Sequence, residues 1–305
     1  MRKKIDAHLH IVPERLLGTR EGPVTYAANG KKTMDNGFVI QTMPNIISNS
    51  AFTVPTIMTV LKDDGVERGV IMQGLSDDAL PDTVSAVQLH GDVFWGAMRL
   101  DPHADNLAER AKYYHAMGLT VVKILMLQKG PYWAYKDNRI NSKAHREVWE
   151  LAEEWGLTVA VDSGAPGTLG YGVNEIEDVV KDYPGLRFVI CHMGQPQMHW
   201  QEGQEDDWKR MRQLGGYPNV WFECSSLSTF FIEEAYPFPS AQKVVRDFID
   251  EFGKEKVLWG SDMPGTLCDG TYRQLIDTYE RSTLLTEEEK DLLFYDNAMK
   301  AYGKR

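Results

Sequence analysis

The chain has 305 residues, in which 33 Lys and Arg stand against 44 Asp and Glu, so its formal net charge is −11. This surplus of acid does not favour nucleic acid or an anionic lipid surface as a partner. The sequence contains no run of about 18 apolar residues, the length that could span a bilayer. The three cysteines, Cys191, Cys224 and Cys268, are few and far apart, which is typical of a cytoplasmic protein without a disulfide framework.

Short β-rich runs alternate with longer amphipathic runs along the chain. Strands are predicted at residues 4–10, 67–73, 93–100, 119–125, 157–162, 186–192, 220–224 and 257–261. Helices are predicted near residues 54–64, 79–90, 105–117, 142–155, 173–183, 205–214, 239–252, 271–281 and 286–302, the last after a capping-box pattern at Thr286. Because each strand is followed by a helix, the pattern favours parallel pairing with right-handed crossovers.

We therefore expect a single domain over residues 1–305, folded as a (β/α)8 TIM-type barrel. A doubly wound open sheet is the alternative, and the absence of a G-x-G-x-x-G motif after any strand weakens it. Residues 11–53, rich in Gly, Asn, Thr and Pro, form a long insertion after the first strand. In a barrel this insertion would lie over the C-terminal face, where active sites form. It is either a plain surface excursion or a lid or substrate-binding segment.

Several predicted strands end in a side chain that can bind a metal ion or move a proton. The carboxyl ends of barrel strands converge on one pocket, so the pattern predicts a site there. Taken alone, each group has an ordinary explanation, because a strand-end Asp often caps a helix and a single His often packs in a core. The groups are His8, His10, Asp162, His192, Glu223 and Asp262, whereas we expect His90, His103, His115 and His145 at the surface.

His8 and His10 are two residues apart, so on a strand they share a face with Cα atoms roughly 6.6 Å apart. From there both imidazoles could tilt onto one ion at about 2.0–2.1 Å. Asp262, at the end of the last strand, neighbours the first strand in a closed barrel. Its carboxylate could bind the ion, accept a proton from bound water, or both.

The chain resembles the amidohydrolase-2 family, the group around aminocarboxymuconate-semialdehyde decarboxylase within the amidohydrolase superfamily. The resemblance implies a distorted barrel with one divalent ion, commonly zinc, held by His8, His10 and Asp262. It places His192 beside the substrate as a proton shuttle or electrophile, and it implies a homodimer. The motifs that carry it are Asp6-Ala7-His8-Leu9-His10, Arg99-Leu100-Asp101-Pro102, Val122-Lys123-Ile124, Cys191-His192-Met193-Gly194 and Trp259-Gly260-Ser261-Asp262-Met263-Pro264.

One motif departs from the family. The family usually has His-x-Gly after the fifth strand, where this chain has Asp162-Ser163-Gly164. Asp162 could replace the imidazole as a ligand, and an added oxygen ligand would shift the preference toward Mn²⁺ or Mg²⁺. Alternatively Asp162 does not bind the ion, and the site is weak or empty.

These residues predict a metal-dependent hydrolase that acts on a small carboxylated, lactone or amide substrate. Asp262 would accept the proton of the attacking water and His192 would stabilise the oxyanion. The groups expected to bind substrate are Arg99, Lys123 and Glu223.

Two other functions remain open. The first is a metal-dependent decarboxylase of an aromatic or unsaturated acid, with aromatic side chains that either line a flat pocket or pack at the rim. The second is an inactive ligand-binding barrel, suggested by the change at Asp162. The aromatic residues are Tyr132, Trp133, Tyr135, Phe230 and Phe231.

Overall fold

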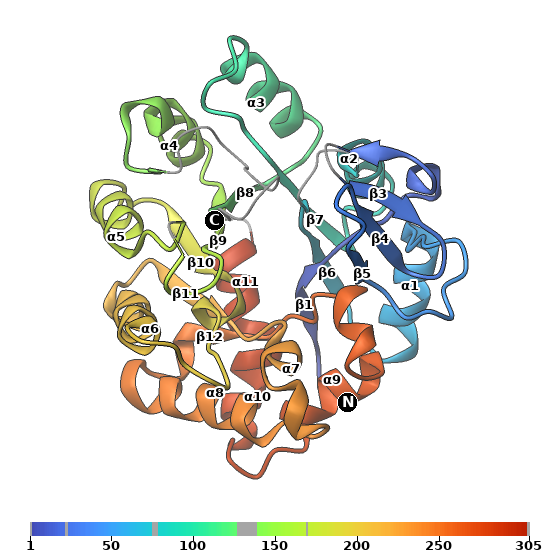
Figure 1. Cartoon of the computed structure of the whole chain (residues 1–305). Helices are drawn as coiled ribbons and strands as arrows, with labels where there is room; N and C mark the ends of the chain where they lie inside the picture. The colour runs from blue at the N-terminus through green and yellow to red at the C-terminus, as the bar shows by residue number, and fades with distance from the viewer. Residues whose placement is uncertain (1, 22–23, 75–78, 127–138, 169, 304–305) are drawn as a thin grey trace.

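The computed structural model describes residues 2–21, 24–74, 79–126, 139–168 and 170–303. Its centre is a barrel of parallel strands surrounded by helices (Figure 1). Neighbouring strands follow one another in chain order around the sheet. The barrel strands are β1 (Ile5–Leu9), β6 (Arg68–Ile71), β7 (Phe94–Met98), β8 (Val121–Leu125), β9 (Thr158–Asp162), β10 (Arg187–Ile190), β11 (Val220–Glu223) and β12 (Val257–Leu258).

The last strand returns to the first, which closes the barrel. The backbone N–H of Ala7 donates to the Trp259 carbonyl at 3.0 Å, and the N–H of Asp262 donates to the His8 carbonyl at 2.7 Å. The Asp6 carboxylate reinforces this seam, because it accepts hydrogen bonds from the backbone N–H of Ser261 at 2.8 Å and from its hydroxyl at 2.6 Å. The predicted TIM-type barrel is therefore confirmed, and the doubly wound sheet is excluded.

The helices occupy the predicted positions to within a few residues. After β1 and its insertion they are α1 (Val54–Asp63), α2 (Leu80–Leu89), α3 (Leu107–Ala116), α4 (Arg146–Glu154), α5 (Val173–Asp182), α6 (Gln204–Arg212), α8 (Pro239–Phe252) and α9 (Tyr272–Glu280). The last predicted helix is α10 (Glu287–Asp291), a π-helical turn (Leu292–Asp296) and α11 (Asn297–Tyr302), and it begins at the predicted capping box. A short helix, α7 (Leu227–Phe230), was not predicted. In the described part of the chain no helix is both long and apolar enough to cross a membrane.

One expectation about the histidines was wrong. His145 is fully buried, and its ring stacks 6.0 Å from that of Trp149. The local pattern around position 145 is that of a helix start, which does not reveal which side of the helix faces the barrel.

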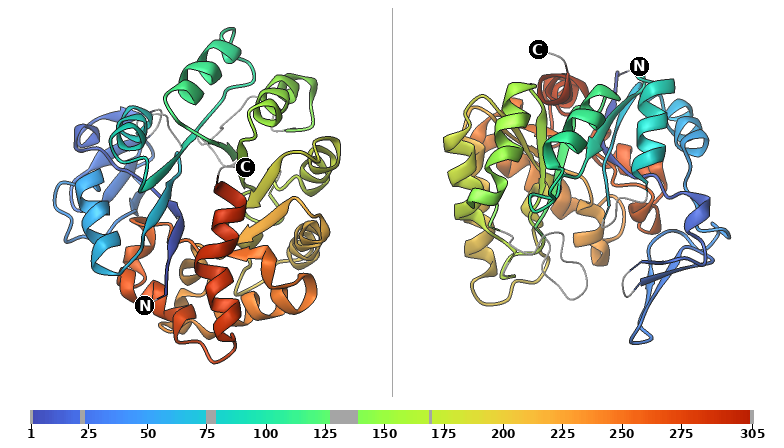
Figure 2. Two further views of the ribbon diagram at one scale, coloured as in Figure 1. Left: turned by 180° about the vertical axis from the view of Figure 1, so that it is seen from behind. Right: turned by 90° about the horizontal axis from the view of Figure 1, so that it is seen from above.

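Two layers of side chains fill the barrel. The lower layer is apolar and packs against α11, which covers that end of the barrel (Figure 2, left). Residues two apart on a strand share a face, so the next inward position on each strand builds an upper layer. That layer is polar on three strands, where Lys123, Asp162 and Glu223 follow Val121, Ala160 and Trp221 by two residues.

The insertion after β1 folds into a sheet of its own, which the sequence pattern did not predict. Four antiparallel strands pair in the order β2 (Arg20–Glu21), β3 (Val24–Ala27), β4 (Lys31–Met34) and β5 (Val39–Gln41). This inserted sheet projects from the barrel on the side opposite the two chain termini (Figure 2, right). It therefore lies toward the carboxyl ends of the barrel strands.

Candidate active site

The first strand brings His8 and His10 together. The register of β1 against β6 shifts between Asp6 and Leu9, and such an irregularity re-aims side chains. Ala7 packs in the apolar layer, while His8 and His10 turn toward each other with their Nε2 atoms 3.2 Å apart.

Both imidazoles have Nδ1 held by an acceptor and Nε2 turned toward the other ring. The Nδ1–H of His8 donates to the Glu223 carboxylate, and the Nδ1–H of His10 donates to the Met72 carbonyl at 3.1 Å. Because an acceptor at Nδ1 fixes a proton there, the Nε2 of the neutral imidazole would carry the lone pair that a metal-binding histidine requires. Burial lowers the pKa of His8 to about 4 despite the nearby Glu223 carboxylate, so His8 is neutral near pH 7.

Asp262 completes a group of three ligand atoms. Its Oδ1 lies 3.0 Å from His10 Nε2 and 3.6 Å from His8 Nε2. Its backbone is left-handed at φ +62°, and its Oδ2 accepts a hydrogen bond from the Ser226 hydroxyl. Burial alone would raise the pKa of Asp262, but the His10 imidazole and its neighbours hold it well below its usual range.

The three atoms have the spacing that one tetrahedral ion requires. Ligand atoms at 2.0–2.1 Å from such an ion lie about 3.3–3.4 Å from one another, and here the separations are 3.0, 3.2 and 3.6 Å. Two lone pairs and a carboxylate oxygen repel one another unless a cation lies among them. The residues present therefore fit one divalent ion.

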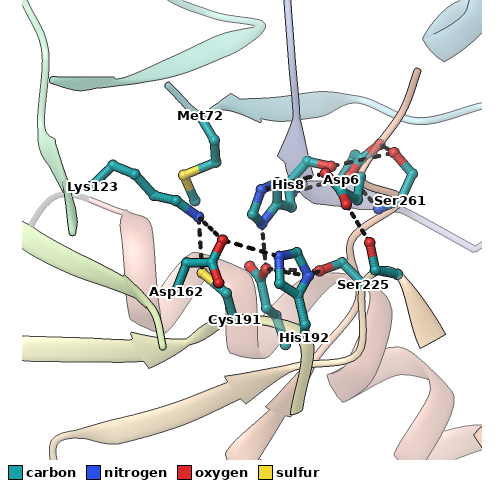
Figure 3. A network of polar contacts seen from close by, with 12 residues as sticks. Asp6, His8, Met72, Lys123, Asp162, Cys191, His192, Ser225 and Ser261 are labelled. Carbon is teal, nitrogen blue, oxygen red and sulfur yellow. Dashed lines mark hydrogen bonds and ion pairs between the residues drawn. The ribbon is translucent and has the colours of Figure 1, made fainter. Parts of the chain in front are cut away.

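A second chain of hydrogen bonds leads from His8 to His192. Ser225 donates its hydroxyl proton to Glu223 at 2.8 Å, so its oxygen accepts from the Nδ1–H of His192, also at 2.8 Å (Figure 3). This arrangement turns His192 Nε2 toward Asp162, whose Oδ2 lies 3.6 Å away. The backbone of His192 is in the left-handed region at φ +57°. The centre of the Phe230 ring lies 6.5 Å from the centre of the His192 ring.

Asp162 lies beside Lys123 and His192 (Figure 3). Its Oδ2 is 4.0 Å from the Lys123 ammonium, and its Oδ1 accepts from Gln195 at 3.2 Å. Burial alone would raise the pKa of Asp162, but His192 and Lys123 lower it well below its usual range. In turn, burial would lower the pKa of His192, but Asp162 raises it. His192 is thus suited to donate a proton.

A second group with metal-ligand chemistry consists of His8, Cys191 and Glu223. The Lys123 ammonium donates to Cys191 Sγ at 3.2 Å, so a fixed positive charge already lies beside this group. Burial raises the pKa of the Cys191 thiol well above its ordinary value. Among the described residues, the groups of three that could hold an ion do not include Asp162.

A cavity of about 210 Å³ adjoins two of the three ligands, far more than the roughly 10–15 Å³ that one water needs. One wall comes from the barrel and the other from the insertion. The cavity is lined by His10, Ile11, Val12, Leu16, Tyr26, Lys32, Thr42, Met43, Gly74, Ala79, Asp262, Pro264 and Gly265.

The residues expected to bind substrate do not line this cavity. Lys123 and Glu223 are fully buried. Lys123 donates a hydrogen bond to Cys191, and Glu223 accepts hydrogen bonds from His8 and Ser225. Arg99 donates to the Gly74 carbonyl at 3.5 Å. None of the three is among the described residues that line the cavity. Phe230 is beside His192, whereas Tyr132, Trp133 and Tyr135 fall outside the described residues.

Three residues at the site were not predicted from the sequence, namely Ser225, Ser226 and Lys32. The two serines directly follow Glu223 at a strand end, so their position was a signal that could have been used. Lys32 gave no comparable signal, because its place depends on how the insertion folds.

Comparison with known proteins agrees with this architecture. L-fucono-1,5-lactonase of Burkholderia ambifaria is 38% identical over 94 residues, which make up 30% of this chain and 30% of that relative. A probable 2-pyrone-4,6-dicarboxylic acid hydrolase of Acinetobacter baumannii, solved with citric acid, superposes with a TM-score of 0.71 at 18% identity over 99% of both chains.

Two further solved structures share the fold. An amidohydrolase of Burkholderia multivorans with bound zinc has a TM-score of 0.72 at 15% identity over 98% of both chains. A 5-carboxyvanillate decarboxylase of Sphingomonas paucimobilis has a TM-score of 0.64 at 12% identity over 99% of both chains. The Amidohydro_2 family model, described as amidohydrolase, matches residues 5–304. The chain belongs to this amidohydrolase family.

Proposed function

We propose that the chain is a metal-dependent hydrolase that opens a small lactone. The observation that carries the proposal is the trio of His8, His10 and Asp262, whose ligand atoms lie 3.0–3.6 Å apart beside a small-molecule cavity. Two imidazoles and one carboxylate suit zinc and leave a coordination position open, as in catalytic sites. The names of two similar proteins, a lactonase and a pyrone dicarboxylic acid hydrolase, support a lactone as the substrate class.

The bound ion would supply Lewis acidity and lower the pKa of a water molecule. The chain supplies the proton transfers. Asp262 is ionised near neutral pH, and its carboxylate, next to the bound ion, would accept the proton of the attacking water and return it to the leaving alkoxide. Asp162 raises the pKa of His192, and we propose that His192 Nε2 would donate a hydrogen bond to the developing oxyanion, a contribution of roughly 2.7–4 kcal/mol for one good donor.

Elemental analysis of protein purified without chelators tests the ligand trio before any substrate is known. We expect about one equivalent of a divalent metal in the wild type and a large loss in the His8→Ala, His10→Ala double variant. Turnover is then measured against a panel of lactones and a panel of hydroxybenzoates. Lactone opening that disappears in the double variant supports the proposal. Release of CO₂ from hydroxybenzoates without lactone opening would overturn it in favour of a decarboxylase, and undiminished turnover in the double variant would overturn the metal-centred site.

A further inference from the structure

Ser226 stands at the start of the short helix α7, where a serine hydroxyl usually caps the helix. Its backbone carbonyl accepts a hydrogen bond from the Thr229 N–H at 3.0 Å, and the side chain of a serine at such a position commonly accepts from the second or third backbone N–H of the helix. The Ser226 hydroxyl makes no such bond. It donates instead to Oδ2 of Asp262, which is 36 positions away in the chain. The hydroxyl thus holds a member of the ligand trio rather than its own helix.

The backbone of Asp262 is held in place without help from Ser226. Its N–H donates to the His8 carbonyl at 2.7 Å, and its carbonyl accepts from the Thr266 N–H at 3.4 Å. These bonds leave the plane of the carboxylate undetermined, because the second side-chain torsion of Asp is broad and roughly two-fold. Contacts of the two carboxylate oxygens must therefore decide which of them faces the histidines.

The two oxygens of Asp262 have different partners. Oδ1 lies 3.0 Å from His10 Nε2 and 3.6 Å from His8 Nε2, whereas Oδ2 accepts the hydroxyl of Ser226. Ser226 is itself buried, so its hydroxyl is not a surface group that turns freely toward solvent. One oxygen of the carboxylate is presented to the histidines, and the other is occupied by the serine.

We propose that Ser226 is a positioning residue that makes Asp262 bind a metal ion through Oδ1 alone. This inference rests on the proposed function and deepens it. A carboxylate can bind an ion through one oxygen or through both, and a second oxygen would take the position that a catalytic zinc site keeps open for water or substrate. By holding Oδ2, Ser226 keeps that position open, and it acts through Asp262.

The same helix offers a matched control. Ser228, two residues further along, donates its hydroxyl at 2.9 Å to Oδ2 of Asp269, and Thr229 donates to the same oxygen at 2.6 Å. In the described part of the chain, Asp269 does not belong to a group of three that could hold an ion. Ser228→Ala therefore removes the same kind of bond, from a serine to an aspartate, without touching the trio.

Visible absorption of the protein loaded with Co²⁺ tests the role without any turnover. Four-coordinate Co²⁺ absorbs visible light more strongly than five- or six-coordinate Co²⁺, so the intensity per bound ion reports the number of ligand atoms. Wild type is compared with Ser226→Ala, Ser226→Gly and Ser228→Ala, and the folding of each protein is checked by circular dichroism. Ser226 has its backbone in the left-handed region at φ +56°. Glycine adopts this region without strain, so Ser226→Gly separates loss of the hydroxyl from strain in the loop.

We expect wild type and Ser228→Ala to give the strong absorption of four-coordinate Co²⁺. Both Ser226 variants should lose intensity per bound ion, because Oδ2 becomes free to join the ligand set. Unchanged intensity in the two Ser226 variants overturns the role, and so does a loss confined to Ser226→Ala or shared equally by Ser228→Ala. A weak spectrum in wild type, or Ser226 variants that bind no Co²⁺, also overturns it, since the hydroxyl then does not keep a position open.

Failure of the proposed function gives a different result. A wild type that binds no Co²⁺ would overturn the metal-dependent site itself, and this role with it. A wild type that binds Co²⁺ but opens no lactone would overturn the hydrolase proposal in the lactone panel, while the spectra still decide the role of Ser226.

Discussion

Replacing Glu223 by Gln should weaken metal binding although Glu223 is not one of the three ligands. The fully buried Glu223 carboxylate accepts the Nδ1–H of His8 and the hydroxyl of Ser225. Gln keeps the shape but removes the charge, and a charge-assisted hydrogen bond is roughly twice as strong as a neutral one. His8 Nε2 then becomes less basic. Loss of such a partner lowers metal affinity by about 10- to 100-fold, or roughly 1.4–2.8 kcal/mol.

The substitution also has a cost in folding. The second oxygen of Glu223 has no hydrogen-bond partner among the residues that the structure describes, so an amide NH₂ placed there would be a buried donor without an acceptor, at a cost of about 1–3 kcal/mol. Metal affinity is therefore measured on folded protein, by competition with a chromogenic chelator, and stability is measured separately by urea unfolding of the metal-free protein.

Asp162→Asn is the matched control, because it removes the same charge from the same polar layer without a hydrogen bond to His8 or His10. We expect its metal affinity to stay within about threefold of the wild type. An unchanged affinity in Glu223→Gln would refute the argument. An equal loss in Asp162→Asn would show instead that Asp162 belongs to the ligand set.

Three further predictions concern His8, Ser225 and Asp6. The pKa of His8 in the folded state is about 4, below its ordinary 6.5. As the pH drops from 6.5 toward 4 the unfolded chain therefore binds a proton before the folded chain does, and the free energy of unfolding falls. Between pH 7 and pH 5, urea unfolding of the metal-free proteins should show a free energy of unfolding that falls by about 2 kcal/mol more in wild type than in His8→Gln. Equal losses would contradict the burial argument. Ser225→Ala removes the hydrogen bond that orients the His192 ring, so kcat should fall about tenfold or more with little change in KM. Ser225→Thr keeps the hydroxyl and should recover most of the lost kcat. The ¹⁵N signals of His192 should show a mixture of tautomers only in Ser225→Ala, and a single unchanged tautomer there would refute the positioning role of Ser225. Asp6→Ala leaves several buried donors at the barrel seam unpaired and should cost at least about 3 kcal/mol, and a loss below about 1 kcal/mol would mean that the seam is held by the backbone alone.

The sequence alone determined the order of strands and helices and the face of each strand that carries chemistry. These properties are local, since the direction of a side chain on a strand repeats every two residues. The pair of His8 and His10 could therefore be predicted as neighbours. Asp162 and Glu223 could be placed near strand ends, because the ends of strands also follow from the local pattern.

Only the tertiary structure decided which of these groups meet. Glu223 lies 215 positions from His8, and Asp162 lies with Lys123 and His192 rather than in the group of His8 and His10, because closure of the barrel and the shifted register of β1 determine the distances between strands. The inserted sheet is a second example, since Lys32 and Tyr26 reach the cavity only after four short strands pair. Such pairing depends on contacts between distant segments, and the period of a single strand does not encode them.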